Sequence, residues 1–173
     1  MNAQERRIRI LTSLREVSSP VSASVLAGQL GVSRQIIVGD VALLRAAGEE
    51  ILSTPRGYVL TGENVPLHPE LRRQIVCSHT ADQMQEELQV CVDNGCTVLD
   101  VIVDHPVYGQ LAGQLQLKTR YDISQFMEKV AAQSAHALSE LTDGIHLHTI
   151  SCPDEAAYLR VCAELKARGF LVE

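Results

Sequence analysis

The sequence predicts an α+β protein of two domains: an N-terminal winged helix-turn-helix, then a two-layer α/β sandwich in which helices cover one face of a mixed sheet. The first observation behind this prediction is a change in the periodicity of apolar residues along the chain. Apolar residues repeat with a helical period early in the chain, and strand patterns alternate with helix patterns later. The second is the turn-rich segment TGENVPLHP at residues 61–69, which breaks both patterns. We therefore expect domains at residues 1–61 and 70–173, joined by a linker at residues 62–69.

Three helices are predicted in the first domain. Residues 4–17 form the first, Ser22 or Ser24 caps a short second helix that ends at Gly31, and Ser33 caps the third. Gly31 suits a helix end because glycine adopts the left-handed conformation at little cost. The apolar faces are expected to hold Ile8, Leu11, Leu14 and Val17 in the first helix, Val25, Leu26 and Leu30 in the second, and Ile37, Val41 and Leu44 in the third.

Two short helices that meet at Gly31 indicate a helix-turn-helix. A β-hairpin follows, with strands at residues 51–54 and 58–60 around the turn Pro55-Arg56-Gly57. Three helices followed directly by a hairpin are the elements of a winged helix.

The third helix is the predicted DNA recognition helix. Its N-terminus offers Ser33, Arg34 and Gln35 to base edges in the major groove. Arg45 lies further along its exposed face, and Arg56 at the hairpin tip is placed to meet a phosphate or the minor groove. The alternative is a three-helix module that binds a protein partner and makes no contact with DNA.

Charge first argues against DNA binding. The 173 residues include 46% hydrophobic and 21% charged residues, which is typical of a globular chain, and the net charge is −6. The charge is unevenly divided, however: residues 1–61 hold seven arginines against five acidic residues, and residues 62–173 hold eight basic against sixteen acidic residues. The first domain thus has a surplus of +2 and the second a net −8. Because +2 is small, we expect useful DNA affinity only from a homodimer.

The sequence also predicts the compartment. Five cysteines form no C-x-x-C pair, no apolar run approaches a membrane span of about 20 residues, and the first residues lack the apolar stretch of a signal peptide. We expect a cytoplasmic protein with reduced thiols and no membrane segment.

The second domain is predicted to follow the order β-α-β-β-α-β-α-β. Its strands are expected at residues 72–77, 96–104, 114–118, 145–150 and 170–172, and its helices at residues 80–93, from Asp122 or Ser124 to 138, and at residues 155–167. Residues 105–109 form a turn between two of the strands.

Histidines indicate the chemistry of this domain. His146 and His148 lie two residues apart in a predicted strand, so both imidazoles point to the same face. His79 follows the first strand and reaches the same place if the two strands are neighbours. Imidazole is a common ligand of transition metals, although single histidines in strands are more often ordinary core residues. His105 and His136 are more simply explained as structural residues.

A carboxylate would complete such a metal site, and the helical phase distinguishes two candidates. Glu86 falls nearly opposite the apolar face centred on Met84, Leu88 and Cys91, whereas Glu87 falls at its border. Glu87 is therefore the better ligand. Three imidazoles and one carboxylate suit Zn, Ni, Fe or Mn and leave positions for water or a small ligand.

Catalytic motifs are absent from the sequence. It contains no G-x-S-x-G, no Walker loop and no G-x-G-x-x-G. Asp100 and Asp104 share one face of a strand, but they are better explained as a polar rim than as a catalytic pair. We expect that the protein is not an enzyme.

The motifs VSRQIIVGDVALLRAAG, RGYVL, DVIVDHPVYG and LTDGIHLHTI, in this order and spacing, resemble those of the nicotinate-responsive transcriptional repressors. These proteins join a winged helix to a three-histidine (3H) domain, and the resemblance spans nearly the whole chain. It implies a dimeric repressor of genes for NAD synthesis and salvage that uses nicotinic acid as co-repressor. It leaves open whether nicotinamide also acts.

The resemblance also implies functional residues. The metal ligands of the family correspond to His79, Glu87, His146 and His148. The family signature HPVYG is expected beside the effector pocket, which would place His105, Pro106, Tyr108 and Gly109 there.

Two other functions are compatible with parts of the sequence. One is a metal-dependent enzyme that acts on a pyridine carboxylate, although no acid–base pair is evident beyond the metal ligands. The other is a bifunctional repressor and biotin ligase, but the second domain is short for a ligase and lacks an adenylate-binding loop rich in glycine and arginine.

Overall fold

The computed structural model describes residues 2–17, 19–61, 71–133 and 135–173. The chain divides into two compact units, Met1–Pro66 and Leu67–Glu173. The predicted linker at residues 62–69 lies outside the described residues. No helix in the described part of the chain has the length and apolar character of a membrane span.

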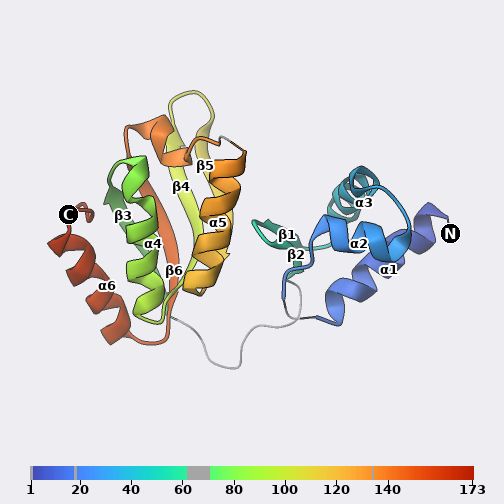
Figure 1. The fold of residues 1–173 in the computed structure, drawn as a ribbon, viewed down its shortest axis with the longest axis horizontal. Helices are drawn as coiled ribbons and strands as arrows, with labels where there is room; N and C mark the ends of the chain where they lie inside the picture. The colour runs from blue at the N-terminus through green and yellow to red at the C-terminus, as the bar shows by residue number, and fades with distance from the viewer. Residues whose placement is uncertain (1, 18, 62–70, 134) are drawn as a thin grey trace. The chain divides into compact units, whose positions relative to one another are not determined.

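The N-terminal unit contains three helices and a hairpin, as predicted (Figure 1). The elements are α1 (Ala3–Arg15), α2 (Ala23–Leu30), α3 (Arg34–Ala46), β1 (Ile51–Thr54) and β2 (Gly57–Leu60). Ser22 and Ser33 cap α2 and α3, and Gly31 ends α2 with a left-handed φ of 65°. The winged helix-turn-helix therefore follows from local signals that agree with one another.

The packing of α1 differs from the prediction. Its buried face holds Ile10 and Leu14, while Ile8 is 58% exposed and Val17, beyond the helix, is 43% exposed. Ile10 lies one helical turn before Leu14, whereas Ile8 is two residues away from Ile10 and projects to the opposite side. Both buried side chains pack in one core with Leu26, Ile37, Val41, Leu44 and Ile51.

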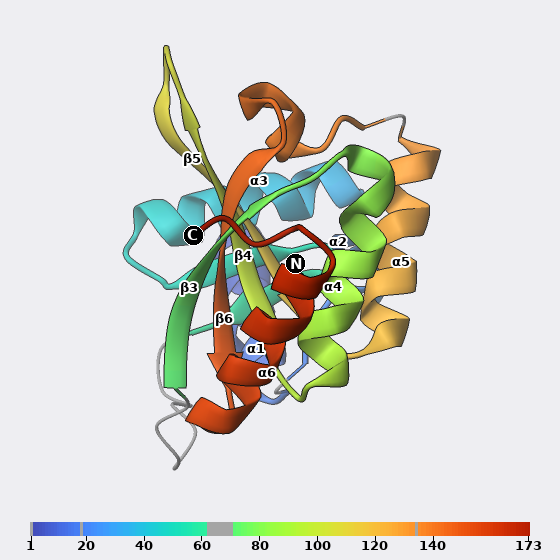
Figure 2. The same ribbon diagram turned by 90° about the vertical axis from the view of Figure 1, so that its left-hand side faces the viewer.

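The C-terminal unit is a four-stranded sheet covered on one face by helices (Figures 1 and 2). Its elements are β3 (Leu71–Ser78), η1 (Ala81–Gln83), α4 (Met84–Asp93), β4 (Thr97–His105), β5 (Gly109–Leu117), α5 (Arg120–Ala132), η2 (Leu138–Thr142), β6 (Ile145–Cys152) and α6 (Glu155–Ala167). The strand order is β3-β6-β4-β5. Helices α4, α5 and α6 form the second layer.

The prediction of a mixed sheet is wrong, because every neighbouring pair of strands is antiparallel. Strands β3 and β4 run in the same direction, as expected across a β-α-β connection, but β6 lies between them. The order of strands depends on pairing between residues far apart in the sequence, which local periodicity does not report.

Three predicted element boundaries also differ. Helix α5 ends at Ala132 instead of continuing to residue 138, β5 begins at Gly109, and the short strand expected at residues 170–172 is reduced to a single bridge between Leu171 and Cys77. His136 consequently lies outside the helix, where its Nδ1 meets the Glu140 carboxylate at 2.9 Å.

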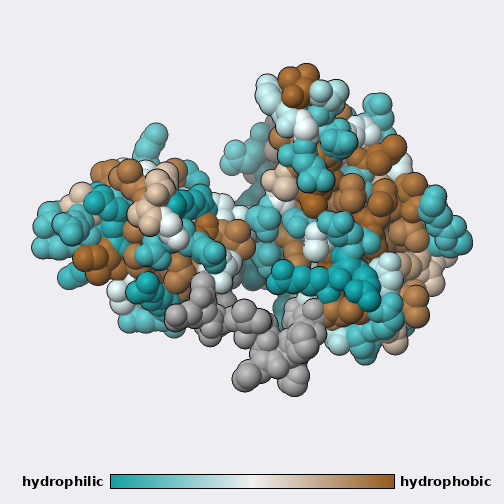
Figure 3. All heavy atoms as spheres, turned by 180° about the vertical axis from the view of Figure 1, so that it is seen from behind, coloured by the Kyte–Doolittle hydropathy of each residue, from teal (hydrophilic) through white to brown (hydrophobic). Residues whose placement is uncertain are grey.

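Alternation along β6 directs its side chains to two different environments. His146, His148, Ile150 and Cys152 are buried on the face that packs under the helices. Leu147 lies on the other face beside its partners Val76 and Ile102, all three half-buried. In Figure 3, viewed from the side opposite the helices, apolar side chains gather on this face. The histidines are thus held in the interior between sheet and helices.

Candidate metal centre

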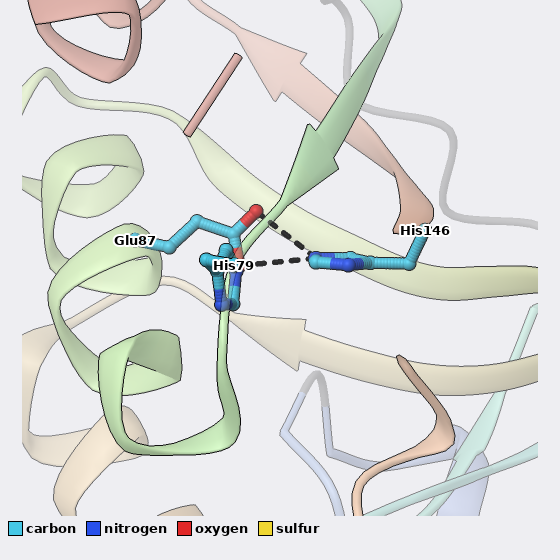
Figure 4. A group of neighbouring side chains, drawn as sticks. All are labelled: His79, Glu87 and His146. Atoms are coloured by element: carbon cyan, nitrogen blue, oxygen red, sulfur yellow. Dashed lines mark hydrogen bonds and ion pairs between the residues drawn. The ribbon is translucent and has the colours of Figure 1, made fainter. Parts of the chain in front are cut away.

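Four predicted ligands meet at one end of the buried layer of the C-terminal unit. His146 and His148 lie on β6, and Cys77 of β3 pairs with His146, which brings His79 to the same place two residues later. Glu87 points from the first turn of α4 into the buried layer between helices and sheet. Figure 4 shows Glu87 and His146 directed toward His79.

The Glu87 carboxylate is the centre of this cluster. Its Oε2 lies 2.6 Å from Nε2 of His79 and 3.3 Å from Nε2 of His148, and both of its oxygens lie 3.2 Å from Nε2 of His146. The side chains are between 0 and 4% exposed. Atoms that bind one ion at about 2.0–2.1 Å are separated by roughly 2.9–3.4 Å. The distances from the carboxylate to the imidazoles are therefore already near those of a metal coordination shell, and the donor atoms of His79, Glu87 and His146 all lie within 4.8 Å of one another.

Backbone carbonyls hold the other nitrogen of each imidazole. The Nδ1 of His79 lies 2.9 Å from the Thr80 carbonyl oxygen. The Nδ1 of His146 lies 2.8 Å from the Gly144 carbonyl oxygen, and that of His148 lies 2.6 Å from the Asp100 carbonyl oxygen. A carbonyl only accepts hydrogen bonds, so each Nδ1 carries the proton. Each Nε2 faces the Glu87 carboxylate, and its lone pair becomes available to a cation when Nε2 carries no proton. A ring protonated at Nδ1 alone is the usual tautomer of metal-binding histidine.

Electrostatics of the cluster favour a cation. Burial alone raises the pKa of the Glu87 carboxyl, but the charge of His148 and the hydrogen bonds from the three imidazoles hold that pKa well below its ordinary value. Burial lowers the pKa of His79 and His148, yet the Glu87 carboxylate outweighs it and raises both above 6.5. A buried anion of this kind attracts either protons or a metal ion.

The donor set fits a divalent transition metal. Three neutral imidazoles and one carboxylate match the ligands of Zn, Ni, Fe and Mn sites. Among the described residues, His79, Glu87 and His146 form the group whose donor atoms are close enough to hold one ion. His148 joins them through its contact with Glu87.

A cavity of about 240 Å³ lies beside His79. Its other lining residues are Thr80, Ala81, Ser139, Glu140, Asp143 and Gly144. Sequence reasoning missed these residues; the one local signal was the turn sequence LTDG, which only predicts a bend.

The HPVYG signature does not line this cavity. It forms the tip of the β4–β5 hairpin, where Tyr108 is 74% exposed and the His105 Nδ1 accepts the amide hydrogens of Val107 and Tyr108. The proposed effector contacts of His105, Pro106, Tyr108 and Gly109 stay predictions.

Relatives of the chain share both of its parts. The 3H domain family matches residues 72–173, and the HTH domain family matches residues 6–59. The transcription repressor NadR of Bacillus subtilis is 42% identical over 168 residues, which are 97% of this chain and 93% of that protein. The probable transcription repressor NiaR of Thermotoga maritima is 41% identical over 170 residues, which are 98% of this chain and 95% of that protein. The chain belongs to the 3H-domain transcription repressors.

The family resemblance predicted from the sequence is thus confirmed. The four clustered side chains lie in the 3H domain, and α1 to β2 lie within the matched HTH domain apart from the first three residues of α1 and the last residue of β2. Both relatives are named as regulators of transcription and neither as an enzyme.

Residues predicted to read DNA occupy two kinds of position in this repressor. Ser33 is the N-cap of α3, and the adjoining Arg34 and Gln35 are exposed in its first turn. Arg45 instead donates to the Ile51 carbonyl at 2.6 Å and to Ser53 Oγ at 2.7 Å. Arg45 therefore ties α3 to the hairpin.

Arg56 lies in the turn between β1 and β2, as the sequence predicted. Its backbone amide donates to Thr54 Oγ1 at 3.2 Å, which stabilises the turn. DNA contacts by Arg45 and Arg56 stay predictions.

Proposed function

We propose that this chain represses genes of NAD synthesis and salvage, with nicotinic acid as a co-repressor that binds in the 3H domain beside a divalent transition metal. The observation that carries the proposal is the convergence of three imidazoles on the buried Glu87 carboxylate in a chain that also contains a winged helix. The names of the two relatives as transcription repressors support it.

In this proposal His79, Glu87, His146 and His148 hold the metal. The carbonyl groups behind the imidazoles fix their tautomers, and burial keeps competing water away. The ion supplies the positive charge that an anionic effector needs inside an otherwise acidic domain.

Nicotinic acid offers a carboxylate and a pyridine nitrogen, and either suits a transition metal. The cavity beside His79 also touches Gly144, whose carbonyl holds His146, so it adjoins two of the four ligands. We propose that the effector occupies this cavity, whose lining includes the acidic residues Glu140 and Asp143. An anion is expected there only when the metal offsets these charges.

Operator binding is assigned to Ser33, Arg34 and Gln35 at the start of α3, with Arg45 and Arg56 supporting or contacting the backbone. The small net charge of +2 in residues 1–61 favours a homodimer, because two DNA-binding domains double the number of phosphate contacts. Half-sites are then expected about one helical turn apart, or a multiple of it. We therefore also propose that the protein acts in the cytoplasm, where operator DNA is found.

A DNA mobility-shift assay tests this function. Metal-loaded and chelated protein are compared with and without nicotinic acid on an operator fragment. We expect the metal and nicotinic acid together to tighten DNA binding, and DNA to tighten effector binding by the same factor, since coupling is reciprocal. Equal operator affinity with and without nicotinic acid would refute the co-repressor role.

Metal content tests the ligand assignment separately. His146→Ala removes a buried ligand, and we expect it to lose bound metal. His136→Ala is the matched control, because that side chain is 86% exposed in the same domain. Full metal content in His146→Ala would overturn the assignment.

We further propose that the protein has no enzymatic activity. Incubation of the metal-loaded protein with nicotinic acid is expected to return the compound unchanged. Formation of a product would favour the alternative, a metal-dependent enzyme that acts on a pyridine carboxylate.

A further inference from the structure

Strand β4 is irregular beside the proposed metal centre. Val98 pairs with Ile150 and Ile102 pairs with Leu147, so four steps along β4 match three steps along β6. One extra residue is therefore inserted into β4, which defines a β-bulge. The pairing with β5 also shifts between Val98 and Asp100, and Gln116 of β5 has a left-handed φ of 55°.

Asp100 lies within this irregular segment and contacts two consecutive residues of β6. Its side chain Oδ1 accepts the amide hydrogen of Thr149 at 2.8 Å, where an unbroken ladder would supply a backbone carbonyl. Its own carbonyl accepts Nδ1–H of His148 at 2.6 Å. The bulge frees that carbonyl for the imidazole, and the carboxylate satisfies the amide that the bulge leaves unpaired.

His148 differs in this respect from the other two histidines. The carbonyls that hold His79 and His146 come from the same stretch of chain, one and two residues away. The carbonyl that holds His148 comes from another strand, 48 residues away in sequence. The carbonyl that orients His148 thus lies in the irregular segment of a neighbouring strand.

We infer that Asp100 is a positioning residue of the metal centre: its carboxylate fixes the β4 bulge, and the bulge fixes the tautomer and orientation of His148. This inference rests on the proposed metal centre. Groups that hold the second nitrogen of a metal-bound imidazole typically affect metal affinity by about 10- to 100-fold.

Variants of Asp100 in the full chain test the inference, with metal affinity measured by competition with a chromophoric chelator. Asp100→Ala removes the acceptor for Thr149, and we expect Zn(II) affinity to fall about 10-fold or more. Asp100→Asn keeps an acceptor oxygen without the charge, and we expect affinity close to that of the unmodified chain. Asp104→Ala is the control, because it removes an exposed carboxylate from the same strand.

Nuclear magnetic resonance of the Zn(II)-loaded chain supplies a readout that general destabilisation would not reproduce. The three Nδ1–H protons are expected as separate, slowly exchanging signals. Asp100→Ala should shift or lose the signal of His148 and leave those of His79 and His146 in place. If Asp100→Ala does not fold, Asp100→Glu replaces it, because it keeps the charge and displaces the oxygen by one methylene, with the same expected loss.

The outcomes separate the two proposals. Normal affinity and an unchanged His148 signal in Asp100→Ala would overturn the role of Asp100 alone, and equal losses in Asp100→Asn and Asp100→Ala would overturn positioning by the hydrogen bond. Failure of the unmodified chain to bind Zn(II), Ni(II), Fe(II) or Mn(II) would instead refute the metal centre itself.

Discussion

Gly144 is packed against the backbone of a proposed metal ligand, which makes its substitution by alanine a sensitive test of the site. The residue has a φ of 92°, and its carbonyl holds the His146 imidazole. A Cβ atom at this position would lie 2.6 Å from the carbonyl oxygen of His79. One added methyl group would therefore displace backbone that positions two of the proposed metal ligands, His79 and His146.

The size of the effect follows from that distance. Cβ contacts below 3.0 Å are essentially never observed, so the two groups must separate by at least 0.4 Å. If the angles at Cα of residue 144 absorbed this shift alone, they would bend by about 15°, which costs about 4 kcal/mol. Sharing the movement with His79 reduces the cost, so we expect Gly144→Ala to lower the free energy of unfolding by about 2–4 kcal/mol beyond the strain of the positive φ itself.

Gly169→Ala measures that backbone strain separately. Gly169 has a φ of 74°, and a Cβ there would meet nothing within 4 Å. Left-handed backbone costs an L-residue roughly 1–2 kcal/mol. The difference between the two variants therefore isolates the contact between residue 144 and His79.

Urea unfolding followed through histidine ring protons is a suitable assay, because all six histidines lie at or beyond position 68 and the signals report the C-terminal unit. Metal affinity of the same samples should fall about 10-fold or more in Gly144→Ala, as for other supports of metal ligands, and should stay unchanged in Gly169→Ala. Equal unfolding energies and equal metal affinities in the two variants would refute the reasoning.

Three further predictions concern acidity and the N-terminal unit. Metal affinity should fall as pH is lowered through the raised pKa values of His79 and His148, because protons then compete for Nε2; a dissociation constant that is the same at pH 8 and pH 6 would contradict this. Gly39→Ala should raise the free energy of unfolding by about 1 kcal/mol in urea titrations, because a Cβ in the middle of α3 meets nothing within 4 Å; a loss of stability would show a hidden contact. Asp40→Ala should lower the free energy of unfolding of the N-terminal unit by about 1–3 kcal/mol, because the carboxylate is 4% exposed and accepts a hydrogen bond from Arg6 at 2.5 Å. An unchanged melting temperature of this unit would show that the ion pair is dispensable.

The sequence predicted the candidate site better than it predicted the sheet. The period of a strand placed His146 and His148 on one face, and the phase of a helix turned Glu87 inward while Glu86 stays outside and meets Arg168 at 3.0 Å. These are properties of single elements, which local patterns report directly.

Features that depend on several elements could not be predicted in this way. The insertion of β6 between β3 and β4 made the mixed-sheet prediction wrong, because strand order is fixed by packing between distant segments. Asp100 was interpreted as part of a polar rim, because a bulge is defined only by the register of β4 against its neighbours. The exposure of Ile8 shows the same limit, since two helical faces of α1 were both compatible with the spacing of its apolar residues.

The central position of β6 has a consequence for how the protein is made. A ribosome delivers β3, α4, β4, β5 and α5 before the strand that joins β3 to β4, so the sheet cannot close until residues 145–152 have emerged. The proposed metal centre is likewise incomplete until then, because His146 and His148 are synthesised long after His79 and Glu87. A nascent chain truncated before β6 would therefore carry the whole winged helix without the proposed metal centre, which is completed only with about the last 30 residues of synthesis.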